Sequence, residues 1–467
     1  MLLKKIVYLL PFIGCISSDL FCKGKVGTGG SFLKGERLSN FGNFNILKYR
    51  KFNNDKLENE GENNPELSEF YKIYDAVKSI KYLNLCLQNM VLIHGQKDFK
   101  FGFSCDGDLA GKIIEIDPFF LSSTKITRDQ YYKFLEIVNK FLKNRNNSMK
   151  LYMPEKKVID KFLGGKKRKK RKSKKNKNNG QVKKKISKEE EKANEELRDK
   201  RFMEYLQDYF ALRNEMFEVL REQGEDYLHF LIPRFEEYKN FPFKDDDFMN
   251  EYMFNESYGD YPIILVNYYQ YVEYCKWQTL CVNEYLFEHL DGKERVMVIF
   301  YPVSYEEYFY ASCCGDSNNI YSCGVSPLNN NYEPLFNFNS VSSTDNKIRI
   351  TKVKKFPKSQ FNIYDSNGNT RVWFGSRESD YSKLSNKKRE PLLNRTNGVF
   401  KRLLDEGYNF RSDNYNEDVD KSFRMTSKGS CNSRLRDAQN GRFINEHVFY
   451  VSPFLGFTLA AKIILDE

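Results

Sequence analysis

The sequence predicts an α+β domain that is rich in irregular structure and carries a disordered basic insertion. Three observations support this prediction. Apolar residues make up 40% and aromatic residues 15% of the 467 positions, which is enough to bury a sizeable core. Most apolar runs are short and are interrupted by Asn, Gly, Ser and Pro, and few stretches show a long helical period. One tract, residues 166–185, holds 13 basic residues and no acidic one, so it cannot bury enough surface to fold.

The formal net charge of +12 belongs to this Lys tract. Outside the tract, the chain has 62 of its 75 Lys and Arg residues and all 63 of its Asp and Glu residues. The rest of the chain is therefore close to neutral. We expect the tract to be a solvated loop, with contact to anionic lipid headgroups as the alternative. Nucleic-acid binding is not expected behind the export signal described next.

The N-terminus has the pattern of an export signal. Residues 1–14 begin with Lys4 and Lys5 and continue with an apolar run that is too short to span a bilayer, which is typical of a signal peptide. The run ends at Cys15 in a Phe-Ile-Gly-Cys sequence that resembles a bacterial lipobox. We predict that Cys15 is lipidated and is the membrane anchor, since no other stretch approaches the roughly 20 apolar residues of a membrane helix. The alternative is an ordinary signal peptide with a coincidental cysteine.

The next segments are an N-terminal arm, residues 15–85, and the first part of the domain, residues 86–143. The arm is polar and irregular, with one short helix expected near residues 67–80. In the first part, apolar residues near a 3.6-residue period predict a helix from about residue 126 to 138. Thr127 is well placed to be its N-cap.

Residues 144–225 are predicted to be a basic and helical insertion, and residues 226–467 the second part of the domain. The insertion contains the Lys tract and then a Glu- and Lys-rich stretch. Apolar residues from Phe202 to Leu212 at helical spacing extend that stretch into an amphipathic helix.

Cysteine and histidine patterns give no sign of a metal site. The ten cysteines contain no CxxC pair, and the adjacent Cys313 and Cys314 would form a strained bridge, so buried thiols are the simplest interpretation. The four histidines lie far apart and begin no HExxH or HxH pattern. A metal-dependent hydrolase is therefore unsupported.

Several short motif blocks occur along the chain. They are residues 91–102, 125–134 (KITRDQYYKF), 261–277 (YPIILVNY then YCKW), 301–311, 356–373 (ending in FNIYDSNGNTRVW), 428–431 (KGSC) and 455–458 (LGFT). No block is decisive alone, but their order, which covers residues 90 to 460, is similar to that of the formylglycine-generating-enzyme family, also called the sulfatase-modifying factors.

The resemblance implies a fold of the formylglycine-generating-enzyme type, which is C-type-lectin-like. Two departures matter: Lys125 replaces the usual Glu, and Val372 stands where a carboxylate is expected. Trp277 and Trp373, the two tryptophans of the chain, would be large core anchors. The positions that match the family motifs are Thr127, Tyr131, Pro262, Trp277, Tyr364, Asp365, Gly368, Asn369, Trp373, Gly429, Ser430, Gly456 and Phe457.

The resemblance also implies how an enzyme of this family would work. Its members bind copper through two cysteines five residues apart, shortly after a Gly-Gly-Ser sequence, because soft thiolates suit Cu(I). Counted from Gly429 and Ser430, these positions are Ser433 and Ala438, and no second cysteine follows Cys431. We therefore predict that the chain is not an enzyme and has no cofactor.

A calcium site is a weaker possibility. Asp365, Asn367 and Asn369 place hard oxygen atoms at alternate positions, as a calcium loop does. The alternative is a turn whose side chains form hydrogen bonds with the backbone.

Within the family, residues 277–284 (WQTLCVNE) and 250–262 resemble the gliding-motility lipoproteins, the J type before the K type. The resemblance implies a non-catalytic structural component of the gliding-motility and type IX secretion apparatus. Its partners would be other proteins of that apparatus and the outer membrane, reached through the lipid. The alternatives are a divergent formylglycine-generating or iron-dependent oxidase, and an envelope protein that binds anionic surfaces through its Lys tract.

Overall fold

The computed structural model describes residues 65–102, 111–143, 188–240, 246–290, 295–322, 335–338, 350–375, 423–427 and 429–465. The predicted signal peptide, Cys15 and the Lys tract lie outside these residues. Among the described helices, none has the length and apolarity that crossing a membrane requires.

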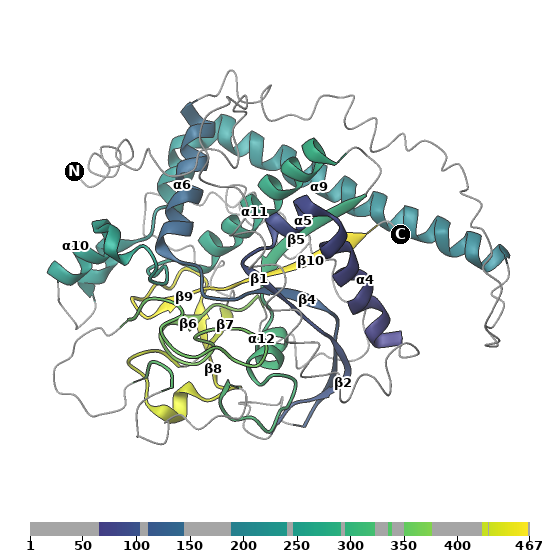
Figure 1. Cartoon of the computed structure of the whole chain (residues 1–467). Helices are drawn as coiled ribbons and strands as arrows, with labels where there is room; N and C mark the ends of the chain where they lie inside the picture. The colour runs from purple at the N-terminus through teal and green to yellow at the C-terminus, as the bar shows by residue number, and fades with distance from the viewer. Residues whose placement is uncertain are drawn as a thin grey trace, which may run out of the picture.

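A four-stranded antiparallel sheet forms the centre of the molecule, in the order β1-β4-β10-β5 (Figure 1). Strand β10 comes from the C-terminus and lies between two strands that are far earlier in the chain. Its register places Leu459 opposite Pro302 and Leu465 opposite Val296. The strands are β1 (Met90–Ile93), β4 (Phe119–Ser122), β5 (Val296–Pro302) and β10 (Leu459–Leu465).

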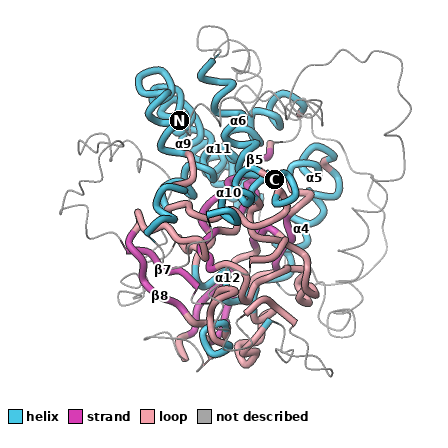
Figure 2. Tube along the Cα trace, turned by 90° about the vertical axis from the view of Figure 1, so that its left-hand side faces the viewer, coloured by secondary structure: helices cyan, strands magenta, loops and turns pink. Residues whose placement is uncertain are grey.

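Helices gather on one side of the sheet, and loops and small strand pairs on the other (Figures 1 and 2). The helical side contains α4 (Pro65–Ser79), α5 (Lys81–Cys86), α6 (Arg128–Lys143), α9 (Lys188–Leu231) and α11 (Tyr268–His289). Apolar residues from α5, α6, α9 and α11 join β5 and β10 in one continuous buried cluster. The expected short helix near residues 67–80 is confirmed by α4.

The loop-rich side contains a second apolar cluster beneath the sheet, in which aromatic rings of α12 pack against Phe99 and Phe101. Its elements are short, in agreement with the predicted irregular structure. They are β2 (Gln96–Lys100), β3 (Ile113–Ile116), α12 (Tyr305–Ser312), β6 (Arg371–Val372), β7 (Phe423–Ser427), 3-10 helix η8 (Leu435–Ala438), β8 (Phe443–His447) and β9 (Leu455–Gly456).

A connecting segment between α9 and α11 wraps the edge of the fold. It consists of η3 (Phe235–Asn240), α10 (Asp246–Phe254) and η4 (Glu256–Tyr258), and its aromatic side chains form a third apolar cluster.

Three helices begin with an N-cap residue of a type that the sequence shows directly. Thr127 precedes α6, its Oγ1 accepts a hydrogen bond from Gln130 N at 3.3 Å, and Gln130 Oε1 accepts one from Thr127 N at 2.8 Å. The predicted N-cap is therefore confirmed. Asn267 before α11 and Ser304 before α12 form the same reciprocal capping boxes.

Helix α9 continues through the expected boundary between residues 225 and 226. Gln223 has non-helical dihedral angles and marks a kink, but the helix continues to Leu231. Phe202, Leu206 and Leu212 are buried in the main cluster, as their helical spacing predicts. The helical part of the expected insertion is therefore part of the domain core.

The cysteines differ from the prediction at one position. Cys275, Cys313 and Cys431 are buried thiols, as expected, and Cys313 is not bridged to its neighbour. Cys314, however, is disulfide-bonded. The prediction of a thiol there was wrong because spacing in the sequence does not reveal which cysteines the fold brings within bonding distance.

Candidate functional site

The motif loop, residues 361–373, connects segments that are distant in the chain. Asn369 is fully buried, and its Oδ1 accepts hydrogen bonds from Thr351 N at 3.0 Å and Asn337 Nδ2 at 3.2 Å. Asn367 Oδ1 accepts one from Ser322 N at 2.7 Å, and its Nδ2 donates to Ala438 O at the same distance. Both amides therefore hold neighbouring loops in place.

Asp365, the third calcium candidate, has different hydrogen-bond partners from the two asparagines. Its Oδ2 accepts a hydrogen bond from Lys354 N at 3.1 Å, and its Oδ1 is buried and accepts none from the described residues. Burial raises the pKa of Asp365, and the charge of Lys125 and the Lys354 N–H oppose that rise. No cluster of three or more His, Cys, Asp or Glu side chains suited to a metal occurs among the described residues. These contacts favour the hydrogen-bonded turn over a calcium loop.

Lys125 lies beneath the same loop and is 2% exposed. Its Nζ donates to Gly368 O and to Thr370 O, each at 2.5 Å. Burial lowers the pKa of Lys125 to about 8, while the nearby Asp365 and Cys431 raise it in part. The sequence marked Lys125 only as a departure from the family Glu. Its partners lie more than 240 positions away, so no local signal could predict them.

The two positions that correspond to the copper cysteines are structural here. Ser433 Oγ accepts a hydrogen bond from Ser430 N at 2.9 Å and lies 3.0 Å from Ser430 Oγ. Ala438 is 2% exposed, and a Cβ on Gly429 would come within 2.5 Å of its Cα, so the backbones are in close contact. Cys431 is a buried thiol whose backbone N–H donates to Asn369 O at 2.7 Å. A hydroxyl and a methyl group offer no soft ligand, so these residues do not fit copper.

A small cleft with a cavity volume of about 20 Å³ lies beside Ala438. Its lining includes the side chains of Tyr305, Tyr308, Phe309 and Phe374 and those of Asn367 and Asn440. Among the described residues, its lining contains no carboxylate, imidazole or thiol. Its other polar groups include the hydroxyls of Ser312, Ser366 and Ser427, those of the two tyrosines, and the Arg442 guanidinium.

Residues 277–284 (WQTLCVNE), called the 277–284 signature below, include side chains that form hydrogen bonds with the edge strand β5 of the central sheet. Asn283 Nδ2 donates to Val298 O at 2.7 Å, and Asn283 Oδ1 accepts from Val298 N at 2.9 Å. One turn earlier, Thr279 Oγ1 accepts from Phe300 N at 2.9 Å. These two side chains of α11 thus take the place of a further strand beside β5, whose open edge would otherwise expose backbone groups.

The same signature attaches α11 to α9. Glu284 Oε1 accepts hydrogen bonds from Arg213 Nε at 2.6 Å and from Tyr209 OH at 2.8 Å. Trp277 is 1% exposed, and its Nε1 donates to Tyr227 OH at 2.9 Å. Residues 277–284 are therefore involved in contacts within the molecule. They attach α9, the helical part of the expected insertion, to α11.

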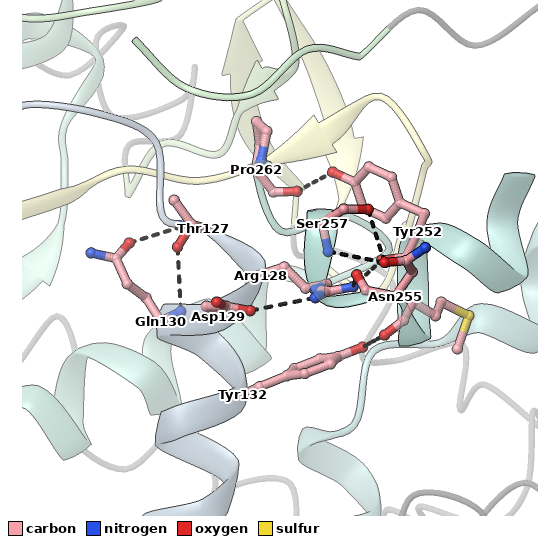
Figure 3. Close-up of polar contacts among 10 residues, drawn as sticks. Thr127, Arg128, Asp129, Gln130, Tyr132, Tyr252, Asn255, Ser257 and Pro262 are labelled. Atoms are coloured by element: carbon pink, nitrogen blue, oxygen red, sulfur yellow. Dashed lines mark hydrogen bonds and ion pairs between the residues drawn. The ribbon is translucent and has the colours of Figure 1, made fainter. Parts of the chain in front are cut away.

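Arg128 joins the start of α6 to α10 (Figure 3). It is 3% exposed, and its Nη1 donates to Tyr252 O at 2.6 Å and to Asn255 O at 2.8 Å, which caps the end of α10. Tyr132 OH donates to Met253 O at 3.1 Å on the same side. An arginine one residue after an N-cap is usually exposed, so the sequence did not identify Arg128 as a buried anchor.

The other motif positions also form the frame of the domain. Tyr131 OH donates to Leu231 O at 2.8 Å, and the fully buried Trp373 donates from Nε1 to Val266 O at 3.2 Å. Pro262 forms a β-bridge with Thr127, and Gly456 leaves no room for a Cβ beside Ile263 O. Phe457 stacks on Tyr271 with ring centroids 4.5 Å apart, and Tyr364 N donates to Ser123 O at 2.8 Å. The predicted core anchors Trp277 and Trp373 are thus confirmed.

Comparison with known proteins agrees with this arrangement at the level of the family. No curated protein sequence matches the chain. Similar solved structures include variable protein 1 of Treponema denticola, at 12% identity and a TM-score of 0.36, covering 79% of this chain and 94% of that one. PvdO from Pseudomonas aeruginosa is 15% identical with a TM-score of 0.30, covering 44% and 63%. CarF is 11% identical with a TM-score of 0.34, covering 80% and 97%.

The sulfatase-modifying factor enzyme 1-like domain matches residues 81–462, which is most of the chain. The matched range contains the central sheet, α9, the motif loop and the Ser433 and Ala438 positions. The chain belongs to the sulfatase-modifying factor enzyme 1-like family.

Proposed function

We propose that this chain is a non-catalytic, lipid-anchored structural component of the outer membrane, within the gliding-motility and type IX secretion apparatus. The observation that supports the non-catalytic part is that Ser433 and Ala438, rather than cysteines, occupy the positions that correspond to the family's copper ligands. Ser433 and Ala438 belong to a hydrogen-bonded and close-packed loop, and the adjacent cleft contains no carboxylate, imidazole or thiol among the described residues. The family architecture is retained while the ligands for its copper chemistry are replaced.

The envelope part of the proposal rests on the sequence and is supported by the cysteines. The expected signal peptide and Cys15 imply export, and the disulfide at Cys314 suits an oxidising compartment. The assignment to the gliding and secretion apparatus rests on the resemblance of residues 250–262 and 277–284 alone.

The anchor is tested by expressing the full chain in a bacterium that processes lipoproteins and feeding it a clickable fatty acid. We expect label on the wild type and on Cys22→Ala, the matched control, because both retain Cys15. The Cys15→Ala variant should lose the label and leave the membrane pellet after a salt wash. Labelled or membrane-bound Cys15→Ala protein would contradict lipidation at this position.

The partner class is tested in the same membranes from a gliding or type IX-secreting host. We expect chemical crosslinking of the wild type, followed by mass spectrometry, to recover other proteins of that apparatus. Deletion of residues 166–185 should leave these crosslinks in place, because the proposed scaffold does not depend on the Lys tract. Loss of all crosslinks on deletion would instead favour an envelope protein that binds anionic surfaces through the tract.

A further inference from the structure

The imidazole ring of His94 lies where three separate segments of the chain meet. Its centroid is 6.5 Å from that of Phe70 on α4, 5.8 Å from that of Tyr310 on α12, and 5.4 Å from that of Phe361 in the motif loop. All three rings meet the imidazole edge to face, an arrangement that aromatic pairs prefer. His94 Nδ1 also lies 2.9 Å from Tyr310 OH and 3.1 Å from Gly95 O. One histidine therefore contacts α4, α12 and the motif loop at the same time.

Helix α4 is an addition to the family domain, because the family match begins at residue 81 and α4 ends at Ser79. The helix packs on the domain through Ile73, which is buried in the main apolar cluster, and through Val77, which lies against that cluster. Phe70, which contacts His94, is one turn before Ile73 and lies on the same face of the helix. Undocking of α4 would therefore remove the Phe70 ring from His94 and admit water to the imidazole.

The surroundings of His94 disfavour a positive charge on its ring. Burial lowers the pKa of His94, and the hydrogen bond with Gly95 O opposes this effect. The titratable group in contact with the ring is the Tyr310 hydroxyl. An imidazolium would lie among aromatic rings instead of in water, which destabilises the charged form. The other charged side chains that the structure describes on these elements are Lys72, Asp75 and Lys78 of α4 and Lys97, Asp98 and Lys100 of β2, all exposed, Glu306 and Glu307 in the first turn of α12, and Asp365 and Arg371 of the motif loop.

We propose that His94 is a pH-sensitive latch that holds α4 on the domain at neutral pH and releases it in acid. The docked state binds fewer protons than the undocked state, because only the docked ring is shielded from water. Docking is therefore fully favourable above the ordinary histidine pKa of about 6.5 and weakens as the pH falls below it. Release would free the segment that precedes the family domain. This inference concerns α4 and is independent of the proposed envelope role.

Hydrogen exchange of the full chain, followed by mass spectrometry, tests the latch. Protection factors correct for the direct effect of pH on exchange, and peptides from α6 are the internal reference for global unfolding. From about pH 7.5 to about pH 5, the protection of α4 amides should fall by about fivefold or more, with less change in α6. The upper limit is about 30-fold, which applies to a histidine that titrates only in the undocked state.

Three variants assign the effect to His94. His94→Gln cannot titrate but can still form a hydrogen bond with Tyr310 OH, so its α4 protection should be nearly independent of pH. His289→Gln is the matched control, because His289 is an exposed histidine on α11, and it should respond as the wild type does. Phe70→Ala leaves His94 open to water at both pH values, so it should lower α4 protection and reduce its pH dependence.

Equal protection of wild-type α4 at the two pH values would overturn the proposal, as would a folded His94→Gln variant that shows the full wild-type fall. Other groups that titrate in this range are common to the wild type and His94→Gln, so the difference between the two reports His94. If His94→Gln does not fold, a reduced pH dependence in Phe70→Ala supports the latch, and an unchanged one contradicts it.

Discussion

Glu284→Ala is expected to lower the free energy of unfolding by about 3–5 kcal/mol, the cost of leaving one partner of a buried ion pair without the other. The Arg213 side chain is 2% exposed and donates from Nε to Glu284 at 2.6 Å. Its guanidinium would then lose a charged acceptor in a place that water does not reach. Urea denaturation followed by the fluorescence of Trp277 and Trp373 measures the change, since both indoles are buried in the folded chain.

The double variant Arg213→Leu with Glu284→Leu distinguishes the charge effect from lost packing. Burial raises the pKa of Glu284 even though Arg213 and Tyr209 oppose the rise. Replacing a buried ion pair by apolar residues of similar volume is often neutral, so removing both charges should restore stability to within about 1 kcal/mol of the wild type. A single variant that costs less than about 1 kcal/mol, or a double variant as unstable as Glu284→Ala, would contradict the role assigned to this pair.

Gly368→Ala is expected to cost about 3–5 kcal/mol, from backbone strain and from a lost buried hydrogen bond. Its φ of 72° is unfavourable for any residue with a Cβ, and a Cβ there would lie 2.0 Å from Asn337 O. Relieving that overlap must move Asn337, whose carbonyl accepts the hydrogen bond from Asn369 N at 2.8 Å.

Gly111→Ala is the matched control for this substitution. Gly111 has nearly the same φ, 77°, but a Cβ there would meet no atom of the described residues within 4 Å. It should therefore cost only the strain of the positive φ, about 1–2 kcal/mol. Equal losses for the two variants in urea denaturation would show that the contact with Asn337 contributes nothing.

Local patterns predicted much of the frame of this fold. The N-cap at Thr127, the helical spacing from Phe202 to Leu212, and the burial of Trp277 and Trp373 follow from short windows of sequence. Motif order also predicted the family, because each block is a short strand, turn or helix start whose form depends on nearby residues. Each of these features depends on residues that lie close together in the sequence.

The sequence could not predict contacts between distant segments. Lys125 reaches Gly368 and Thr370, and Arg128 reaches the end of α10, across more than a hundred positions. Likewise, Asn283 was visible as a signature residue, but its role at the edge of β5 depends on how α11 lies on the sheet. The disulfide at Cys314 was also missed, because the spacing of cysteines does not show which of them come within bonding distance.

The boundary expected at residue 225 illustrates this limit. Composition separates the Lys tract from the rest of the chain, but it does not show where a helix that follows the tract will pack. Glu284 on α11 and Arg213 on α9 place that helix in the core through an ion pair whose two members look unremarkable in the sequence.

The content of copper and iron in the purified full chain tests the central claim most directly, because the account holds that this family architecture no longer carries a redox metal. After expression with both metals supplied and removal of loosely bound ions, we expect mass spectrometry to find far less than one equivalent of either per chain. A variant with Ser433→Cys and Ala438→Cys is the positive comparison for copper, provided that it folds. Stoichiometric copper or iron in the wild type, together with oxidation of a cysteine-containing peptide, would contradict the account.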